Sequence, residues 1–263
     1  MDLNVRSAIE FHTSCHNPLI SVVTPTITSR HAFHVSLYQC FRQQTYPTTE
    51  LVVVDETGDP SPVFSRLDDP RIRYIQAAKG MTIGEKRNLG MEIAKGEVIA
   101  HFDDDDYYSP EYLDFMWSQM RSKAADLVKL SAWMWYDLVS EKLARFDGLS
   151  DGDHTRLYGY GFSYMYRKDS IRAIHGFGAI NFGEDYDLVR RAFEAQLVVR
   201  HFASPSGRPC VLHILHGGNT SSCFATQQIP ASRLSQLFGG DRCVLHLARI
   251  RKAMCIAAGL AVG

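Results

Sequence analysis

The sequence predicts an α/β protein built on a single Rossmann-like, mostly parallel central sheet flanked by helices. Short runs rich in β-branched residues, at 19–23, 51–54 and 97–102, alternate with segments of helical spacing. Polar residues follow each of these runs directly, as is common at the carboxyl ends of strands in such folds. The length of 263 residues and the 45% share of hydrophobic residues suit one globular domain.

The elements of the first half follow one another in a regular order. Strands are expected at residues 19–23, 51–54, 72–75 and 97–102, and helices at 32–44, at 82–94 and after Ser109. Thr82 and Glu85 have the spacing of a capping box at the start of the second helix. Pro110 falls in the first turn of the third helix, where its missing N–H costs little. Strands and helices in this alternation indicate βαβ units.

The second half is less regular, and its elements are expected from shorter patterns. Strands are predicted at residues 126–135, 161–167, 197–202 and 210–215, and a helix at 184–195. From Pro230 the pattern favours a helix that is broken at Gly239-Gly240. We therefore expect one domain over residues 1–225 and a C-terminal helical extension over residues 226–263.

The charge balance and the hydropathy pattern exclude several classes of protein. Lys and Arg number 28 against 29 Asp and Glu, a formal net charge of -1, so we expect no nucleic-acid partner. No run approaches the roughly 20 apolar residues of a membrane span, and residues 1–6 lack the apolar start of a secretory signal. The six cysteines are scattered without a CxxC pair, which favours reduced thiols. These features together predict a cytoplasmic location.

Polar clusters follow three of the predicted strands. They are Thr24-Pro25-Thr26, Asp55-Glu56 and Asp103-Asp104-Asp105-Asp106. Ligands of parallel sheets bind beyond the carboxyl ends of the strands. We therefore expect the three clusters to converge on one edge of the sheet.

The run of four aspartates is the strongest chemical signal in the chain. Adjacent carboxylates repel one another unless a cation lies near them. Carboxylate oxygens are preferred ligands of Mg²⁺ and Mn²⁺, usually one or two per ion alongside substrate phosphates. The alternative is a solvated acidic turn, but the position directly after a strand favours a site for Mn²⁺ or Mg²⁺.

Two further features have a binding and a structural interpretation. Lys79, Lys86 and Arg87 lie near the start of the helix that opens at Thr82, where a phosphate group would be favoured. Ordinary basic residues on a surface helix are the alternative. The pair Asp55-Glu56 can accept hydrogen bonds from a ribose or a base, or can simply cap a turn.

Several motifs in register resemble those of family 2 glycosyltransferases. They are Ser21-Val22-Val23-Thr24-Pro25-Thr26, Gln44-Thr45-Tyr46, Val52-Val53-Val54-Asp55-Glu56, Arg87-Asn88-Leu89-Gly90, Ala94-Lys95-Gly96-Glu97, and His101-Phe102-Asp103-Asp104-Asp105-Asp106 with Pro110. Farther on, residues 183–188 resemble the acidic ED motif, and residues 216–221 resemble a histidine-bearing segment of some members. Several motifs in the same order are more specific than any one of them.

The resemblance implies a GT-A fold, with residues 1–225 as the catalytic domain, and an inverting transfer from a nucleotide-sugar, most often a UDP-sugar. It does not identify the acceptor. It also implies that Asp103-Asp104-Asp105 is the DXD motif. Asp105 would hold the metal directly, and Asp103 or Asp104 would hold it through water or contact the ribose. His216 would be a further metal ligand, with His213 as a weaker rival.

The same resemblance assigns the remaining site residues. Thr24, Pro25 and Thr26 would line the nucleoside pocket, with Asp55 and Glu56 beside the base. Glu56 is a departure, since the family usually has aspartate there. Arg87 would approach the pyrophosphate, and within the pair Glu184-Asp185 the aspartate would be the general base.

Two other functions use similar chemistry. A nucleotidyltransferase also combines a nucleotide, a metal and an α/β sheet, but residues 24–30 contain no glycine-rich signature loop. A non-catalytic binding module that kept the fold is the other alternative. Such a module would be recognised by loss of the base or of the metal carboxylates, and Asp185 and Asp105 are both present.

Overall fold

The computed structural model describes residues 17–56, 58–204, 208–219 and 222–257. Three predicted features extend beyond these ranges. The start of the chain at residues 1–6, the end of the histidine-bearing segment at Thr220 and Ser221, and the last part of the C-terminal extension lie outside the described residues.

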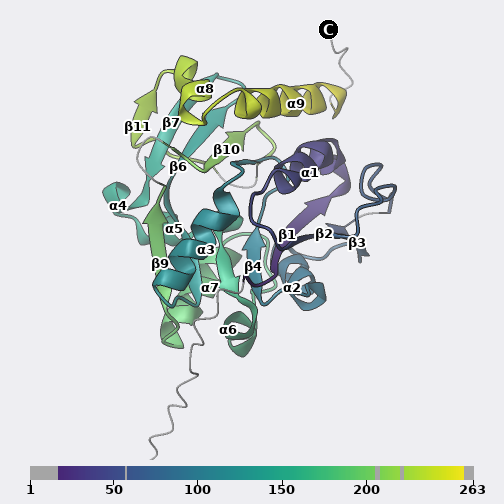
Figure 1. Cartoon of the computed structure of the whole chain (residues 1–263), viewed down its shortest axis with the longest axis vertical. Coiled ribbons are helices and arrows are strands. Elements are labelled where there is room, and N and C mark those ends of the chain that lie inside the picture. Colours follow the sequence, from purple (N-terminus) through teal and green to yellow (C-terminus); the bar gives the residue numbers. More distant parts are fainter. Residues whose placement is uncertain (1–16, 57, 205–207, 220–221, 258–263) are drawn as a thin grey trace, which may run out of the picture.

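A central sheet of eleven strands organises the described part of the chain (Figure 1). Eight of the strands follow one another in the order β11-β7-β6-β8-β4-β1-β2-β3, while β9 and β10 pair with β6, and β5 pairs with β10. The strands are β1 (Ile20–Ile27), β2 (Thr49–Glu56), β3 (Ile72–Ala77), β4 (Val98–His101), β5 (Tyr107–Tyr108), β6 (Leu127–Asp137), β7 (Lys142–Asp147), β8 (Met165–Arg167), β9 (Val199–Ala203), β10 (Val211–Leu215) and β11 (Gln227–Ile229).

The part of the sheet formed by β4, β1, β2 and β3 is entirely parallel, which confirms the predicted fold class. Alternate residues of these strands pack into two different apolar cores, since Val22 and Val53 face one core while Val23 and Val52 face the other. Burial on both faces explains why the strands are continuous apolar runs rather than alternating ones. Strand β8 pairs antiparallel with both β4 and β6, and so joins the two parts of the sheet.

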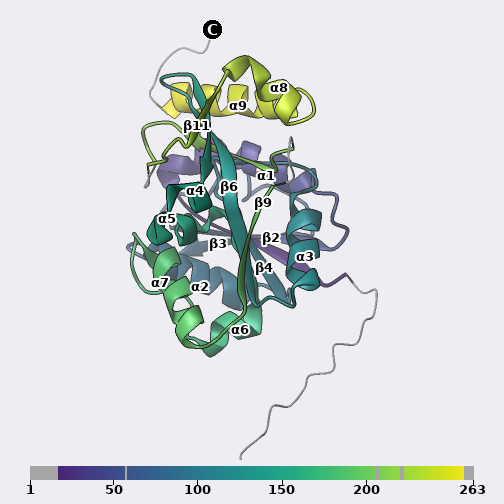
Figure 2. The ribbon, with the colours of Figure 1, turned by 90° about the vertical axis from the view of Figure 1, so that its left-hand side faces the viewer.

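Helices cover both faces of the sheet. Those with bounds in the described residues are α1 (His34–Arg42), α2 (Ile83–Ile93), α3 (Tyr112–Ser122), α4 (Gly148–Asp151), α5 (His154–Tyr158), α6 (Lys168–Ala173), α7 (Glu184–Glu194), α8 (Leu234–Leu237) and α9 (Arg242–Ala257), with 3₁₀ turns at Thr28–Phe33, Gly161–Ser163 and Ala231–Arg233. Buried residues of α1, α3 and α9 belong to one core, and those of α2, α6 and α7 belong to the other. Figure 2 shows α3 and α7 on opposite sides of the sheet.

Local sequence signals fixed some boundaries, and the tertiary structure moved others. The capping box of Thr82 and Glu85 is present at the start of α2. Strand β1 continues to Ile27, because β2 pairs with it along its whole length. The predicted strand at residues 161–167 is a 3₁₀ turn followed by the short β8. The C-terminal extension is not purely helical, because it begins with β11, which pairs with β7.

The C-terminal helix α9 packs on the same core as the sheet. Cys243, Leu247 and Ile250 are buried in the core that also contains Val22 and Leu37. Figure 1 shows α9 at one end of the molecule beside α1. None of the helices in the described part is both long and apolar enough to cross a membrane.

Candidate active site

A cleft of about 980 Å³ opens where strands β1, β2 and β4 end. Residues from all three predicted polar clusters line it, together with residues of α2 and of the start of α7. Those that matter below include Pro25, Thr26, Glu56, Arg87, Asp103 and Asp185. The expected convergence follows from the parallel pairing of β1 with β2 and β4, which brings their carboxyl ends to one edge.

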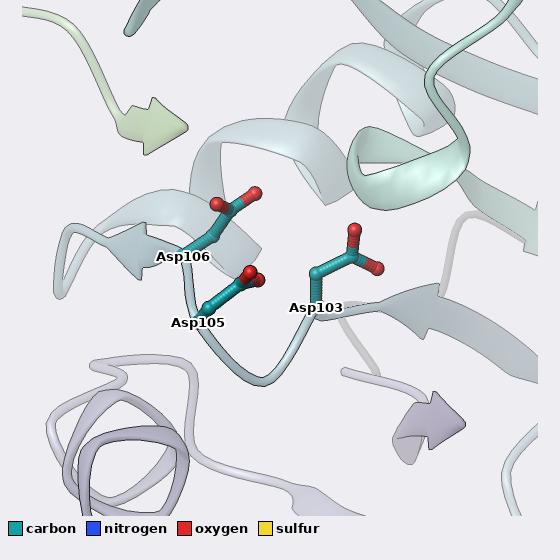
Figure 3. Close-up of side chains that lie close together, drawn as sticks. All are labelled: Asp103, Asp105 and Asp106. Atoms are coloured by element: carbon teal, nitrogen blue, oxygen red, sulfur yellow. The ribbon is translucent and has the colours of Figure 1, made fainter. Parts of the chain in front are cut away.

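The aspartate turn, residues 103–106, connects β4 to β5 and carries a group of three carboxylates. Asp103, Asp105 and Asp106 each offer one oxygen, and these oxygens lie within 4.8 Å of one another (Figure 3). Burial and, next, the charge of Asp106 raise the pKa of Asp103 to about 7. Carboxylates this close together repel one another when all are ionised, and a cation between them would relieve the repulsion. Their oxygens are the ligands that divalent cations such as Mg²⁺ and Mn²⁺ prefer.

Arg30 contacts the aspartate turn, although nothing in the sequence pattern assigned it there. Its Nη2 lies 2.5 Å from Asp104 Oδ1 and 2.6 Å from Asp105 Oδ2. The 3₁₀ turn after β1 brings the guanidinium to this position. Burial opposes ionisation of Asp105, but Arg30 and a hydrogen bond from His216 outweigh it and hold the pKa of Asp105 below its usual range.

Two histidines, His213 within β10 and His216 directly after it, contact two different carboxylates of the turn. His216 Nε2 lies 2.8 Å from Asp105 Oδ2, beside the carboxylate with which the sequence grouped it. His213 Nδ1 lies 2.8 Å from Asp106 Oδ2, and the Ile214 N–H donates to the other oxygen of Asp106. Asp106 is fully buried and is not among the residues that line the cleft, whereas Asp103 and Asp105 line it and are the better candidates for metal ligands.

The predicted nucleoside residues divide into those that line the cleft and those that lie beneath it. Pro25, Thr26 and Glu56 line the cleft. Thr24 and Asp55 are fully buried and are not among the lining residues, although they lie in the same strands, β1 and β2, as Thr26 and Glu56. Asp55 Oδ2 accepts a hydrogen bond from the Tyr74 hydroxyl at 2.6 Å and lies 2.7 Å from His31 Nε2.

Glu56 is fixed at the edge of the cleft by two donors. The Gly80 N–H donates to Oε1 at 2.6 Å, and Lys86 Nζ lies 3.1 Å from Oε2. The Gly80 hydrogen bond is the main cause of a lowered pKa for Glu56, and Lys86 adds to it against the effect of burial. The side chain is therefore an ionised acceptor in the lining of the cleft.

A buried network of hydrogen bonds runs from the aspartate turn to Asp55. The Thr26 hydroxyl donates to Asp104 Oδ2 at 2.6 Å, so it must accept from His34 Nε2 at 3.0 Å. This fixes the tautomer of His34, whose Nδ1 then accepts from the Ser61 hydroxyl at 2.8 Å. The full path runs through Asp104, Thr26, His34, Ser61, Tyr74 and Asp55.

Arg87, expected at the pyrophosphate, and Glu184, expected beside Asp185 among the catalytic residues, form a buried ion pair. Arg87 Nη1 lies 2.7 Å from Glu184 Oε1, and both residues line the cleft. Burial raises the pKa of Glu184, while the charge of Arg87 opposes that shift. Glu184 is thus positioned to neutralise and orient Arg87, and Asp185 is the better candidate for a base.

Asp185 lies in the wall of the cleft at the amino-terminal end of α7. Its Oδ2 accepts from the Gly161 N–H at 2.9 Å, and its Oδ1 accepts from the Tyr186 N–H at 2.7 Å. Asp185 is one of three acidic residues in the first turn of α7. Each oxygen accepts only one of these bonds and keeps a further lone pair, so Asp185 can still accept a proton.

Aromatic side chains around Asp185 complete the cleft on the side away from the aspartate turn. Phe182, Phe224 and Tyr160 line it, and Phe182 is 75% exposed. The Tyr160 hydroxyl donates to the Ser222 carbonyl at 2.7 Å. Spacing along the chain could not group these three aromatic residues, because they come from loops that are far apart in the sequence.

Comparison with known proteins finds similar chains among glycosyltransferases. Glycosyltransferase GlyG of Streptococcus pneumoniae serotype 4 is 30% identical over 115 residues, 42% of this chain and 38% of that protein. The UDP-Glc:alpha-D-GlcNAc-diphosphoundecaprenol beta-1,3-glucosyltransferase WfgD of Escherichia coli is 28% identical over 104 residues, 39% of this chain and 41% of that protein. The chain thus spans less than half the length of these relatives.

Solved structures share the fold at low sequence identity. Staphylococcus aureus TarS 1-349 in complex with UDP-GlcNAc has a TM-score of 0.60 at 15% identity, covering 86% of this chain and 72% of that one. Mannosyltransferase PcManGT from Pyrobaculum calidifontis, in complex with GDP-Man and Mn²⁺, has a TM-score of 0.59 at 12% identity, covering 95% and 77%. These likenesses confirm the GT-A fold predicted from the motifs.

The family model described as Glycosyl transferase family 2 matches residues 21–173, more than half of the chain. The matched part contains β1, β2, α2 and the aspartate turn, which are the elements that carry most of the predicted motifs. On this match, together with the shared fold, the chain belongs to glycosyl transferase family 2.

Proposed function

We propose that the protein is a metal-dependent, inverting glycosyltransferase that moves a sugar from a nucleotide-sugar, most simply a UDP-sugar, to an acceptor hydroxyl. The observation that carries the proposal is that Asp185 and the carboxylates of the aspartate turn line the same cleft. A donor held by the turn would present its sugar towards Asp185. The cleft lining runs from Pro25 to Phe224, within the catalytic domain that we assign to residues 1–225.

The donor would bind across the ends of β1, β2 and β4. Asp105 and Asp103 would hold Mn²⁺ or Mg²⁺, with His216 beside them, and a bound ion would offset the charge of the leaving diphosphate. Glu56 would accept from the nucleoside at the other end of the cleft. Similar proteins support a nucleotide-sugar as donor. The structure of TarS is a complex with UDP-GlcNAc, and that of PcManGT is a complex with GDP-Man and Mn²⁺.

The transfer itself would depend on Asp185. The acceptor hydroxyl would give its proton to the carboxylate while its oxygen forms the new bond to the anomeric carbon. The bond from that carbon to the nucleoside diphosphate would break on the opposite face. One base and no covalent intermediate means inversion, so NMR of the product should show the anomeric configuration opposite to that of the donor. Retention of configuration would contradict this mechanism.

Calorimetric titration with nucleoside diphosphates, with and without Mn²⁺, tests the donor half of the proposal. We expect UDP to bind only when Mn²⁺ is present. The Asp105→Asn variant should lose this Mn²⁺-dependent binding. Asp114→Asn, an aspartate of α3 that lies outside the cleft lining, is the matched control and should bind as the wild type does. If a well-folded sample bound no nucleotide, the non-catalytic alternative would replace this one.

A further inference from the structure

Lys129 is a lysine buried near the start of β6, and it contacts Gly159, which lines the cleft. Its side chain is fully buried, and its Nζ donates to the backbone carbonyls of Leu157 and Gly159, the latter at 2.5 Å. The rings of Trp133 and Tyr164 lie 5.6 and 5.7 Å from the ammonium. Within the described ranges, no carboxylate forms an ion pair with it.

The two carbonyls that Lys129 binds are at the carboxyl end of α5. Carbonyl groups at a helix end carry partial negative charge and lack partners in the helix, so a buried cation stabilises them. The backbone then turns through Tyr160, which has a left-handed conformation with φ of 62°. Such a conformation is unfavourable for a tyrosine and persists only when its surroundings hold it.

The segment that Lys129 holds is also the segment that holds Asp185. The Gly161 N–H, one residue after the turn, donates to Asp185 Oδ2 at 2.9 Å. The Tyr164 hydroxyl lies within hydrogen-bond distance of the carbonyls of Tyr158 and of Asp185, the second at 3.1 Å, and its single hydrogen is shared between them. Residue 161 has no room to move towards α2, since a Cβ there would lie 2.7 Å from Arg87 Nη1.

We propose that Lys129 is a positioning residue for Asp185, acting through residues 157–161. Its Nζ donates to the carbonyls at the end of α5 and so holds the backbone there. The turn at Tyr160 follows directly, and it orients the Gly161 N–H towards the carboxylate of Asp185. Lys129 cannot touch a substrate, because its side chain is fully buried. The inference rests on the role of Asp185 as base proposed above, but the anchoring of the segment can be measured without it.

The groups that face Lys129 also predict how pH acts on it. Asp185 of α7, His201 of β9 and the ring of Tyr164 surround the ammonium. Burial lowers the pKa of Lys129 to about 7, although Asp185 opposes the shift. Between pH 7 and the ordinary pKa of lysine the unfolded chain binds more protons than the folded one, so stability should rise with pH in that interval.

Amide exchange in Lys129→Met tests the anchoring. We expect the Gly161 amide and its neighbours in residues 157–161 to exchange roughly tenfold faster by NMR. The matched control is Lys168→Met, since Lys168 Nζ also donates to a carbonyl at a helix end, that of Ala94 at 2.7 Å, away from the cleft. Unchanged exchange in a folded Lys129→Met protein would overturn the proposal.

A kinetic measurement tests the consequence for Asp185. Release of UDP from UDP-GlcNAc with Mn²⁺ should fall by about 10²-fold in Lys129→Met, with the Kd for UDP unchanged. Faster amide exchange with a normal rate of release would refute the positioning role. If the wild-type protein itself releases no UDP, the proposed function fails while the exchange data still decide the anchoring. Lys129→Gln, which keeps an N–H donor without the charge, replaces the methionine variant if that variant does not fold.

Discussion

Individual charges in the cleft have different partners, and the partners separate their functions. Glu184 and Asp185 are adjacent in sequence, yet Glu184 pairs with Arg87 while Asp185 accepts only backbone N–H groups. Glu184 is held by Arg87, whereas each oxygen of Asp185 keeps a lone pair in the cleft wall that can take a proton from a bound hydroxyl.

Replacement of Asp185 by asparagine tests this division of roles. Asp185→Asn should keep the affinity for UDP and lose transfer by about 10²–10⁴-fold, because an amide cannot take the acceptor proton. Asp187→Asn is the control on the same helix, since Asp187 pairs with Arg190 and Arg191 outside the cleft lining. Near-normal transfer in Asp185→Asn would remove this residue as the base.

Arg30 competes with any divalent cation for Asp105. Its loss leaves the carboxylates of Asp104 and Asp105 without their shared partner, which should lower the unfolding free energy by about 1–3 kcal/mol. We expect Arg30→Gln to melt at a lower temperature than the wild type without metal, and to gain more from added Mn²⁺. Thermal unfolding with and without Mn²⁺ measures both effects. Equal stabilisation of the two proteins would contradict the competition.

At the scale of elements, the buried network through His34 connects β1, the start of α1 and the loop before β3. Burial, more than any neighbouring charge, lowers the pKa of His34 to about 4. The neutral ring is needed because its Nδ1 accepts from Ser61 while its Nε2 donates to Thr26. The neutral form of His34 is thus the one that can make both hydrogen bonds and keep the network continuous.

Acid should therefore weaken the fold through His34. Between pH 6.5 and about 4 the unfolded chain protonates this histidine and the folded chain does not, so the unfolding free energy falls as pH falls. The loss attributable to the residue is on the order of 3 kcal/mol. His34→Gln should flatten this part of the stability curve in urea titrations, and the exposed His154→Gln should not. An unchanged slope in His34→Gln would show that other groups cause it.

At the scale of the whole molecule, helix α9 contributes both to the core and to the support of the aspartate turn. Ile250 is fully buried, and His246 Nε2 lies 3.4 Å from the carbonyl oxygen of Asp105. Residues more than 140 positions apart in sequence therefore lie together behind the turn. The C-terminal extension is therefore packed on the main core of the domain.

Truncation of Ile250 measures how far the extension belongs to the fold. Ile250→Ala should lower the unfolding free energy by about 2–5 kcal/mol, because it leaves a cavity in the main core. Leu245 lies on the same helix and is 54% exposed, so Leu245→Ala should lower the unfolding free energy much less. Urea denaturation compares the two. Equal and small effects would mean that α9 is only loosely attached.

The sequence by itself determined the parallel half of the sheet, the capping box of α2 and the convergence of three polar clusters. These follow from local patterns, because period, cap spacing and the position of a residue after a strand are readable along the chain. The family resemblance, rather than a local pattern, grouped His216 with Asp105, and the structure has His216 Nε2 2.8 Å from Asp105 Oδ2. The family motifs concentrate in this part of the chain.

Only the tertiary structure decided which charges pair with which. The contacts of Arg30 with Asp105, of Arg87 with Glu184 and of Lys129 with residues 157–161 join segments far apart in the chain. It also placed Thr24 and Asp55 outside the lining of the cleft, where both side chains are fully buried. Spacing along a chain carries no record of such contacts, since packing of the sheet against its helices sets the distances between them.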